Sequence, residues 1–228
     1  MFNHKWQNLL LLAGSYAFYS AWNWKFLSLI VVSTVVDYIC GLLIYDSKEA
    51  KRRKIILFVS MFSNLSILGF FKYFNFFIAD FQAVFSHIGV HIPFRPLNIV
   101  LPVGISFYTF QTMSYTIDIY RGEMKPTRNF SDFALFVAFF PQLVAGPIER
   151  AKKLLPQIQS PRKITLEMVY DGSFLIFWGL FQKMVIADNL AKIADPVFAL
   201  SGSQNGVKVM WAVYAFSFQI LCDFAGYY

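Results

Sequence analysis

Six ionisable residues lie within or at the ends of long apolar stretches of this 228-residue chain. A charged side chain at the depth of a lipid bilayer costs free energy, so such a group is usually paired or functional. Lys72 and Lys183 lie near segment ends, from which a long side chain reaches the polar interface, and we interpret both as interfacial. Asp118 lies three residues before Arg121, so a local ion pair is the plain alternative to a functional role. The full set is Asp37, Lys72, Asp118, Asp171, Lys183 and Asp223.

Asp223 stands out in this set because of the residues that follow it. Phe224 and Tyr227 are bulky, whereas Gly226 would permit the close approach of another backbone. A hydrogen bond to a neighbouring helix is the plain interpretation of this carboxylate. A group that faces a tunnel is the alternative.

The sequence lacks the usual signatures of soluble enzymes, namely a Gly-rich phosphate loop, a helical zinc pair and a nucleophile elbow. The histidines are His4, His87 and His91. His87 and His91 have a spacing that suits a metal on a helix, but Gly89 lies between them and Pro93 follows. No carboxylate or thiolate follows Asp80 in this stretch. We therefore predict no metal site.

The composition indicates whether water or a lipid bilayer surrounds this protein. Hydrophobic residues make up 57% of the chain and charged residues only 14%, against about 25% charged residues in a typical soluble domain. A water-soluble globule of this size has no interior for so many apolar side chains. The net charge of +7 would suggest nucleic acid in a soluble protein, but the basic residues here cluster between apolar stretches, as in cytoplasmic loops. We predict an all-α integral membrane protein, with the lipid bilayer and no nucleic acid as partner.

Seven apolar segments are the candidates for its helices. A spanning helix needs about 20 mostly apolar residues, and most of the segments approach this length. No internal repeat or low-complexity linker divides them, so we expect residues 1–228 to form a single membrane domain, a multi-helix transmembrane bundle. The segments cover residues 6–24, 26–45, 55–71, 96–117, 133–148, 168–187 and 209–228.

Three gaps between the segments are basic. Residues 46–54, 121–128 and 150–163 hold thirteen of the twenty Lys and Arg residues. If the chain runs inward before the first gap and before the second, both gaps are cytoplasmic, as the preference for positive cytoplasmic loops requires. Segment 133–148 is then flanked by basic gaps on both sides. A full crossing by this segment would place one of them on the wrong side.

The same segment contains residues that interrupt a helix, namely Pro141, Gly146 and Pro147. Broken backbone at membrane depth survives only where protein or water satisfies it. We therefore predict a re-entrant element that enters and leaves on the cytoplasmic side and lines a cavity. An amphipathic helix on the membrane surface is the alternative.

Segment 96–117 carries a row of hydroxyl groups. Ser106, Thr109, Thr112 and Thr116 are three, three and four residues apart, which places them on one face of a helix. Hydroxyls in membrane helices mostly bond to neighbouring helices. Lining a polar tunnel is the alternative.

Several stretches of the sequence form an ordered set of motifs. They are LPVGISFYTF at 101–110, SYTIDIYRG at 114–122, DF at 132–133, FPQLVAGPI at 140–148 with Arg150, and DFAGY at 223–227. In this order and spacing they resemble the membrane-bound O-acyltransferase family. The alginate O-acetyltransferase type is the most similar branch, and the resemblance spans nearly the whole chain, including residues 8–19 and 69–75.

The resemblance implies a multi-pass enzyme of the bacterial inner membrane with a central tunnel. Such an enzyme moves an acyl group, here expected to be acetyl, from a cytoplasmic donor such as acetyl-CoA to hydroxyls of an exported or cell-surface polysaccharide, directly or through a partner acetyltransferase on the far side. Alginate, another exopolysaccharide, peptidoglycan and teichoic acid remain possible acceptors. D-alanyl transfer is less expected, because residues 142–146 resemble the acetyl branch. The donor is a co-substrate, and no tightly bound cofactor is expected.

The resemblance also implies which part of the enzyme this chain is. The family's hallmark histidine has no counterpart at His4, His87 or His91, so we expect it beyond residue 228. The chain is then the N-terminal half of a longer protein, inactive alone and without a catalytic residue of its own. A transporter or channel subunit and a non-catalytic assembly subunit are the competing functions.

The expected substrate-binding or tunnel-lining residues follow from the same resemblance. Arg150, in the Gly-Pro-x-x-Arg stretch at the inner end of the re-entrant element, would bind the donor's phosphates or pair with a buried carboxylate. An ordinary basic loop residue is the plain alternative for Arg150. Asp223 is the second candidate, and Gly146, Pro147 and Asp118 complete the set.

Overall fold

A computed structural model of the chain describes residues 3–87, 89, 97–143, 149–199 and 205–227. Within these ranges every regular element is a helix. Four helical stretches are long and apolar enough to cross a bilayer, namely His4–Asp46, Ala50–His87, Leu166–Ala199 and Gly206–Ala225. The prediction of an all-α integral membrane protein is confirmed.

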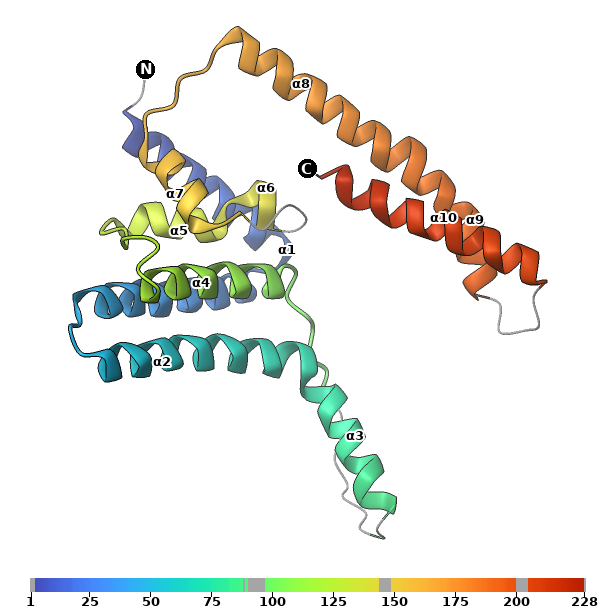
Figure 1. Ribbon diagram of the computed structural model, residues 1–228, viewed down its shortest axis with the longest axis horizontal. Coiled ribbons are helices and arrows are strands. Elements are labelled where there is room, and N and C mark those ends of the chain that lie inside the picture. The colour runs from blue at the N-terminus through green and yellow to red at the C-terminus, as the bar shows by residue number, and fades with distance from the viewer. Residues whose placement is uncertain (1–2, 88, 90–96, 144–148, 200–204, 228) are drawn as a thin grey trace. The chain divides into compact units, whose positions relative to one another are not determined.

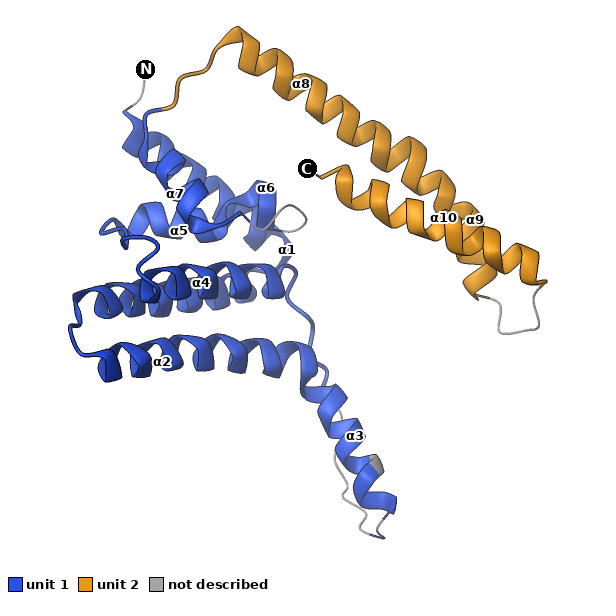
Figure 2. Ribbon diagram, in the orientation of Figure 1, with its two compact units in different colours: residues 1–144, 148–161 blue, residues 145–147, 162–228 orange. Residues whose placement is uncertain are grey.

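The chain divides into two compact units (Figure 2). Unit 1 holds the described residues up to 161, and unit 2 holds those from 162 onwards. Each unit has its own set of packed helices, and all of the predicted re-entrant segment that the structure describes lies in unit 1.

Helix α1 (His4–Asp46) covers two of the predicted segments and is kinked between them. Asn23 leaves the helical conformation, with φ −162° and ψ 108°. Its side-chain Oδ1 accepts a hydrogen bond from the Lys25 amide at 3.1 Å, a local bond that competes with the helical pattern. The two arms therefore run in different directions (Figure 1).

The core of unit 1 is built by the second arm of α1 together with α2 (Ala50–Leu68) and α4 (Ile105–Tyr120). These three helices lie side by side (Figure 1). Small residues bring membrane helices close together, and here a Cβ on Gly41 would lie 2.8 Å from Tyr115 Cε1 of α4. Tyr115 in turn lies against Phe133, with ring centroids 4.4 Å apart. This aromatic pair contributes about 0.5–1.5 kcal/mol beyond its burial.

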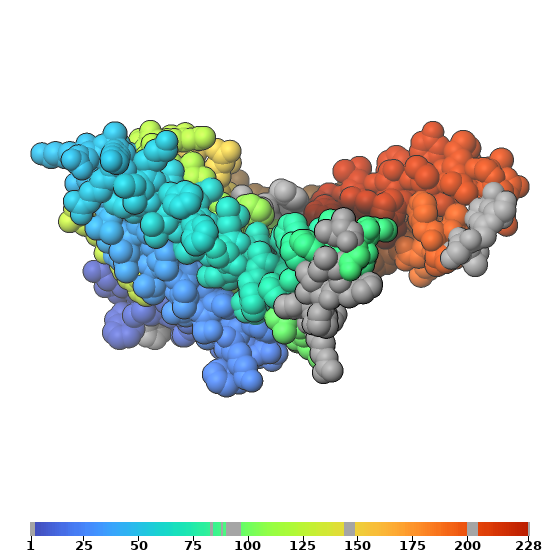
Figure 3. Space-filling view, turned by 90° about the horizontal axis from the view of Figure 1, so that it is seen from below, coloured from blue at the N-terminus to red at the C-terminus, as the bar shows by residue number. Residues whose placement is uncertain are grey.

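Helix α2 continues through a π-helical turn, η1 (Gly69–Tyr73), into α3 (Phe74–His87). Figure 3 shows the face of unit 1 that these elements cover. Along α2, Phe58, Phe62 and Leu65 follow one another at helical spacing, which places them on one face, and they are 66%, 63% and 45% exposed. A row of exposed large apolar side chains is stable against lipid and unfavourable against water, so this face contacts the bilayer.

The remaining elements of unit 1 are short. They are α5 (Phe130–Ala138), α6 (Phe140–Leu143) and α7 (Ala151–Gln159). The sequence placed α7 in a basic gap rather than in a helix, and this expectation was wrong. Its apolar residues fall on one face, where Ala151, Leu155 and Ile158 are buried against unit 1, while its lysines point outward.

Unit 2 consists of two antiparallel helical stretches. α8 (Leu166–Leu180), the π-helical η2 (Phe181–Ala187) and α9 (Asp188–Ala199) form one continuous stretch, and α10 (Gly206–Ala225) returns beside it (Figure 1). The stretch 168–187 predicted from sequence is thus extended by twelve residues of amphipathic helix.

Candidate functional site

The two basic segments that flank the predicted re-entrant element touch each other. Lys152 Nζ of α7 lies 2.9 Å from Glu123 Oε2 of the loop after α4. Gln159 Nε2 donates a hydrogen bond to Thr127 Oγ1 at 2.9 Å. The chain therefore enters and leaves segment 133–148 at the same end of unit 1, as a re-entrant element requires.

The first basic gap joins the same end. Arg53 Nη2 donates a hydrogen bond to the Tyr120 carbonyl at 2.6 Å, and Arg128 Nη2 lies 3.9 Å from Asp46 Oδ1. We call residues 46–54, 121–129 and 149–160 together the basic end of unit 1. It carries eleven Lys and Arg and only four Asp and Glu residues. The expectation that the first two basic gaps share one side is confirmed.

Helix α5 is too short to cross a bilayer and too deeply buried to lie on the membrane surface. Its nine residues span about 13 Å at 1.5 Å per residue, less than half of a hydrocarbon core of about 30 Å. A surface helix would expose a polar face, but every residue from Phe133 to Ala138 is fully buried. The surface-helix alternative is therefore wrong for α5.

The helical path breaks at Phe139, which has φ −58° and ψ 107°. A helix end leaves carbonyl groups without partners, and these must be satisfied at membrane depth. Gln111 Nε2 of α4 donates to the Phe136 carbonyl at 2.9 Å, and Gln142 Nε2 donates to the same oxygen at 3.2 Å. The Phe140 amide donates to Ser15 Oγ of α1 at 3.3 Å. Three side chains thus hold the break in place.

The start of the re-entrant element is also anchored. Asn8 Nδ2 donates hydrogen bonds to Asp132 Oδ1 and to the Ile158 carbonyl, each at 2.9 Å. Asp132 lies in the first turn of α5, where the helix dipole favours a negative charge. One buried amide therefore ties α1, α5 and α7 together. The sequence analysis missed both Asn8 and Gln111, and the signal was a polar amide in an otherwise apolar helix.

Asp37 is the centre of a buried polar cluster between α1, α2 and α4. Ser60 Oγ donates to its Oδ1 at 2.6 Å, and Asn64 Nδ2 donates to its Oδ2 at 2.7 Å. Ser33 Oγ donates to Asn64 Oδ1 at 2.6 Å. Two hydrogen bonds from α2 thus compensate the burial of this carboxyl group, and Ser33 of α1 holds one of the two donors.

Two of the predicted hydroxyl row belong to this cluster. Thr116 Oγ1 lies 3.1 Å from Ser60 Oγ, and Thr112 Oγ1 lies 3.4 Å from Ser33 Oγ. For these two threonines the interpretation as helix packing is confirmed. Ser106 instead accepts a hydrogen bond from the exposed Lys72 Nζ at 3.3 Å, in agreement with an interfacial lysine.

Arg150 lies at the basic end, at the N-terminal cap of α7, and is exposed. Glu123 is nearby, and its pKa is lowered by the hydrogen bond and charge of Lys152, with smaller contributions from Arg121 and Arg150. Within the described ranges Arg150 makes no ion pair of its own. Its guanidinium is therefore free to meet an anion.

Asp118 does not form the predicted local ion pair. Arg121 Nη1 lies 4.0 Å from Glu123 Oε1 instead, because the chain turns at residue 121 and carries the arginine away from its own helix. Asp118 is 6% exposed, and its Oδ2 has no hydrogen-bond partner among the described residues. It shares a face of α4 with Gln111, two helical turns away. Gly146 and Pro147 lie outside the described residues.

In unit 2, Asp223 and Lys183 form an ion pair. Lys183 Nζ lies 2.8 Å from Asp223 Oδ1 and 3.0 Å from Asp188 Oδ1. Lys183 thus links η2 to the end of α10, and its interfacial position stays a prediction. A Cβ on Gly179 would collide with the Gly226 carbonyl oxygen, so the predicted close backbone approach at Gly226 is confirmed.

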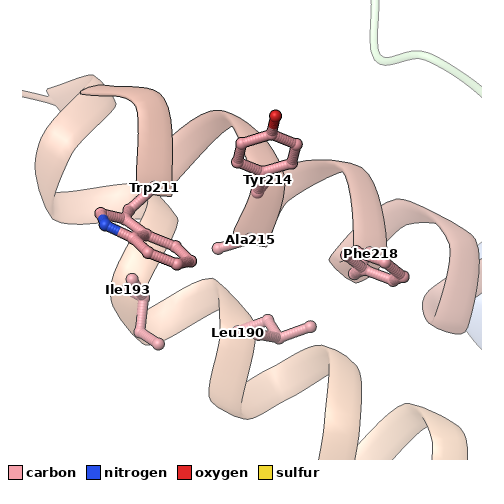
Figure 4. Close-up of a pocket in the computed structure, with 6 residues that line it drawn as sticks. All are labelled: Leu190, Ile193, Trp211, Tyr214, Ala215 and Phe218. Atoms are coloured by element: carbon pink, nitrogen blue, oxygen red, sulfur yellow. The ribbon is translucent and has the colours of Figure 1, made fainter. Parts of the chain in front are cut away.

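Unit 2 also has an open apolar cavity of about 740 Å³ between α9 and α10. Leu190 and Ile193 lie across the cavity from Tyr214, and Figure 4 shows the Tyr214 hydroxyl pointing away from them. Among its lining residues there is no carboxylate, imidazole or amine. It is lined by Leu190, Ile193, Trp211, Tyr214, Ala215 and Phe218.

Known proteins resemble this chain along its whole length. The probable alginate O-acetylase AlgI of Azotobacter vinelandii is 42% identical over 98% of the chain, which corresponds to 44% of that protein. The AlgI of Pseudomonas aeruginosa is 41% identical over 98% of the chain and 42% of that protein. The chain belongs to the membrane-bound O-acyltransferase family. It spans less than half the length of these relatives, and no family model matches it.

Another relative is named for a different polymer. The peptidoglycan O-acetyltransferase of Helicobacter pylori is 34% identical over 99% of the chain, which covers 47% of that protein. Within the described residues, no three His, Cys, Asp or Glu side chains cluster as metal ligands would. The described part of the chain combines the buried helix α5 with an accessible cationic end.

Proposed function

We propose that the full-length protein transfers acetyl groups from an acyl donor to hydroxyls of an exported or cell-surface polysaccharide. The observation that carries this proposal is the similarity, over 98% of the chain, to a protein named as an alginate O-acetylase. Both O-acetylated polymers named for the relatives are polysaccharide-containing. No relative supports the transporter or channel alternative.

Acyl transfer to a sugar hydroxyl needs a base that accepts the hydroxyl proton and donors that stabilise the developing oxyanion. The described histidines lie at helix ends, His4 at the start of α1 and His87 at the end of α3. We assign neither to the reaction. In the proposed enzyme, a histidine beyond residue 228 is the base, and this chain alone is inactive.

The contribution proposed for unit 1 is the donor side of the tunnel. The basic end faces the cytoplasm of a bacterial inner membrane, because positive loops are retained there. A donor such as acetyl-CoA carries several phosphates, and the exposed guanidinium of Arg150 suits their bidentate recognition. The fixed backbone break at Phe139 then forms part of the wall along which the acyl group passes.

The other candidates receive supporting roles in this scheme. Gly146 and Pro147, outside the described residues, are kept as tunnel-lining candidates on the strength of the sequence motif. Asp118, buried with an unpaired oxygen, faces the tunnel. Asp223 holds the end of α10 through Lys183, and units 1 and 2 belong to one membrane domain. On the far side, the acceptor is the polysaccharide itself or a partner acetyltransferase.

The test compares two neighbouring cations in the full-length protein. Arg150→Ala is expected to reduce polysaccharide O-acetylation about 10- to 100-fold, because a charge-assisted contact to a phosphate contributes about 1.5–3 kcal/mol. Lys153→Ala, an exposed residue of α7, is the matched control and should retain acetylation. Equal acetylation in both variants would remove Arg150 from the donor site. A rise in KM for the donor at unchanged protein level identifies the step.

A further inference from the structure

A second cavity, of about 350 Å³, opens at the basic end of unit 1 between the 121–129 loop and α7. Its apolar part is formed by Met124, Leu155 and Pro156, and its polar part includes Glu123, Lys125 and Lys152. Leu155 is almost completely buried, whereas both lysines are exposed. The cavity therefore joins an apolar floor to a charged rim.

The charge on this rim is unbalanced. Glu123 neutralises only part of it, since Lys152 lies 2.9 Å and Arg121 4.0 Å from its carboxylate. Lys125 makes no ion pair with any described residue. The charge of Arg150 also reaches Glu123, where it helps to lower the pKa of this carboxyl group. Three cations thus act on one carboxylate and Lys125 adds another positive charge to the rim, which leaves room for a further anion.

The surroundings indicate what kind of anion fits. The cavity lies where α4 ends and beside α7, a helix that is apolar on one face and basic on the other. Basic pockets and basic amphipathic helices next to spanning segments bind the phosphate groups of anionic lipids. A small soluble phosphate would meet the same lysines but would leave the accessible parts of Met124 and Pro156 uncovered. An amphiphile satisfies both parts of the cavity.

We propose that this cavity binds a phosphate ester, and specifically the phosphodiester headgroup of an anionic phospholipid, between Lys125 and Lys152. The phosphate lies at the rim, and the glycerol and first methylene groups lie on the apolar floor. Arg150 is not among the residues that line this cavity, and the site does not depend on the acyl-transfer activity. It would fix the 121–129 loop and α7, and with them both ends of the re-entrant element.

The test measures phospholipid binding to the full-length protein in detergent by native mass spectrometry, with phosphatidylglycerol as probe and phosphatidylcholine as reference. Each lysine near a phosphate contributes about 1 kcal/mol, so Lys125→Gln with Lys152→Gln should weaken phosphatidylglycerol binding about 30-fold at 1.4 kcal/mol per tenfold. The matched control is Lys48→Gln with Lys51→Gln, which removes two exposed charges from the basic end outside the cavity. It should lose about threefold at most.

A variant with the opposite expected effect guards against simple misfolding. Glu123→Gln removes the rim carboxylate and should strengthen phosphatidylglycerol binding about fivefold. A purely structural role of Glu123 would weaken binding instead. Equal losses in the two double-lysine variants would show diffuse attraction only and would overturn the cavity site, as would weaker binding in Glu123→Gln.

Two soluble probes identify the source of the phosphate. Inorganic phosphate and glycerol 3-phosphate at millimolar concentration are expected to leave phosphatidylglycerol bound. Displacement by glycerol 3-phosphate, with the same sensitivity to Lys125 and Lys152, would support the phosphate-ester site and assign it to a soluble ligand. Absence of any binding of the three probes that depends on these lysines refutes the site.

Discussion

Replacing Gln111 by leucine tests whether the backbone break of the re-entrant element is held by side-chain hydrogen bonds. Gln111 is 4% exposed and donates to the Phe136 carbonyl at 2.9 Å, while Gln142 donates to the same oxygen at 3.2 Å. A buried acceptor that loses all its partners costs about 1–3 kcal/mol. Because Gln142 remains, Gln111→Leu alone should lower the free energy of unfolding by about 1 kcal/mol.

The double variant makes the prediction specific. With Gln111→Leu and Gln142→Leu together, the Phe136 carbonyl has no donor, and the loss should exceed the sum of the single losses by about 1 kcal/mol. The assay is reversible unfolding of the full-length protein in mixed micelles, followed by circular dichroism. Gln157→Leu, an exposed glutamine on α7, is the matched control and should change the free energy by less than about 0.5 kcal/mol.

The result that refutes this reasoning is additivity. If the two leucine substitutions add within about 0.3 kcal/mol, the two glutamines do not share one acceptor. If Gln111→Leu behaves like Gln157→Leu, the break needs no side-chain donor, and the re-entrant element must be stabilised by packing alone.

Two further predictions concern other parts of unit 1. Gly104→Ala should lower the free energy of unfolding by more than about 2 kcal/mol, because φ is +74° and a Cβ would collide with the Leu143 carbonyl oxygen. Gly69→Ala, with φ −61° and open space around it, should be neutral or stabilising, and equal thermal stability of the two variants would contradict the argument. The lowered pKa of Glu123 means that its ionised form stabilises the fold above the ordinary glutamate pKa of about 4.3. This contribution should disappear as the pH falls through the lowered pKa. The difference in unfolding free energy between wild type and Glu123→Gln, measured from pH 7 to pH 3, should therefore shrink; a constant difference would exclude the Glu123 carboxylate as its source.

The pairing of Lys183 with Asp223 shows where sequence reasoning reached its limit. Each charge was visible as an exception in an apolar stretch, but the two are forty positions apart. Their contact depends on the rotation of η2 and α10 about their axes and on the close approach of Gly179 and Gly226. The ion pair between Asp118 and Arg121 failed for the complementary reason, since spacing alone does not say where the helix ends.

The basic gap at 150–163 gives a similar contrast. Its charge was read correctly as belonging to the same side as residues 121–128, and Lys152 does contact Glu123. Its conformation was not foreseen, because the apolar residues of α7 number only a few within a charged stretch. The helix depends on the surface of unit 1, which buries Leu155 and Ile158.

The sequence by itself determined the membrane environment and the all-helical class, its motifs indicated the family, and its charge pattern predicted the re-entrant path of segment 133–148. The membrane environment, the helical class and the predicted re-entrant path follow from hydropathy, charge and proline positions, which act locally along the chain and need no knowledge of its partners. Tertiary structure alone decided how Gln111, Asn8 and Asp37 satisfy buried polar groups, and which cations surround Glu123. Hydrogen bonds and ion pairs require atoms within about 3 Å, and only the packing of helices brings residues from distant segments to that distance.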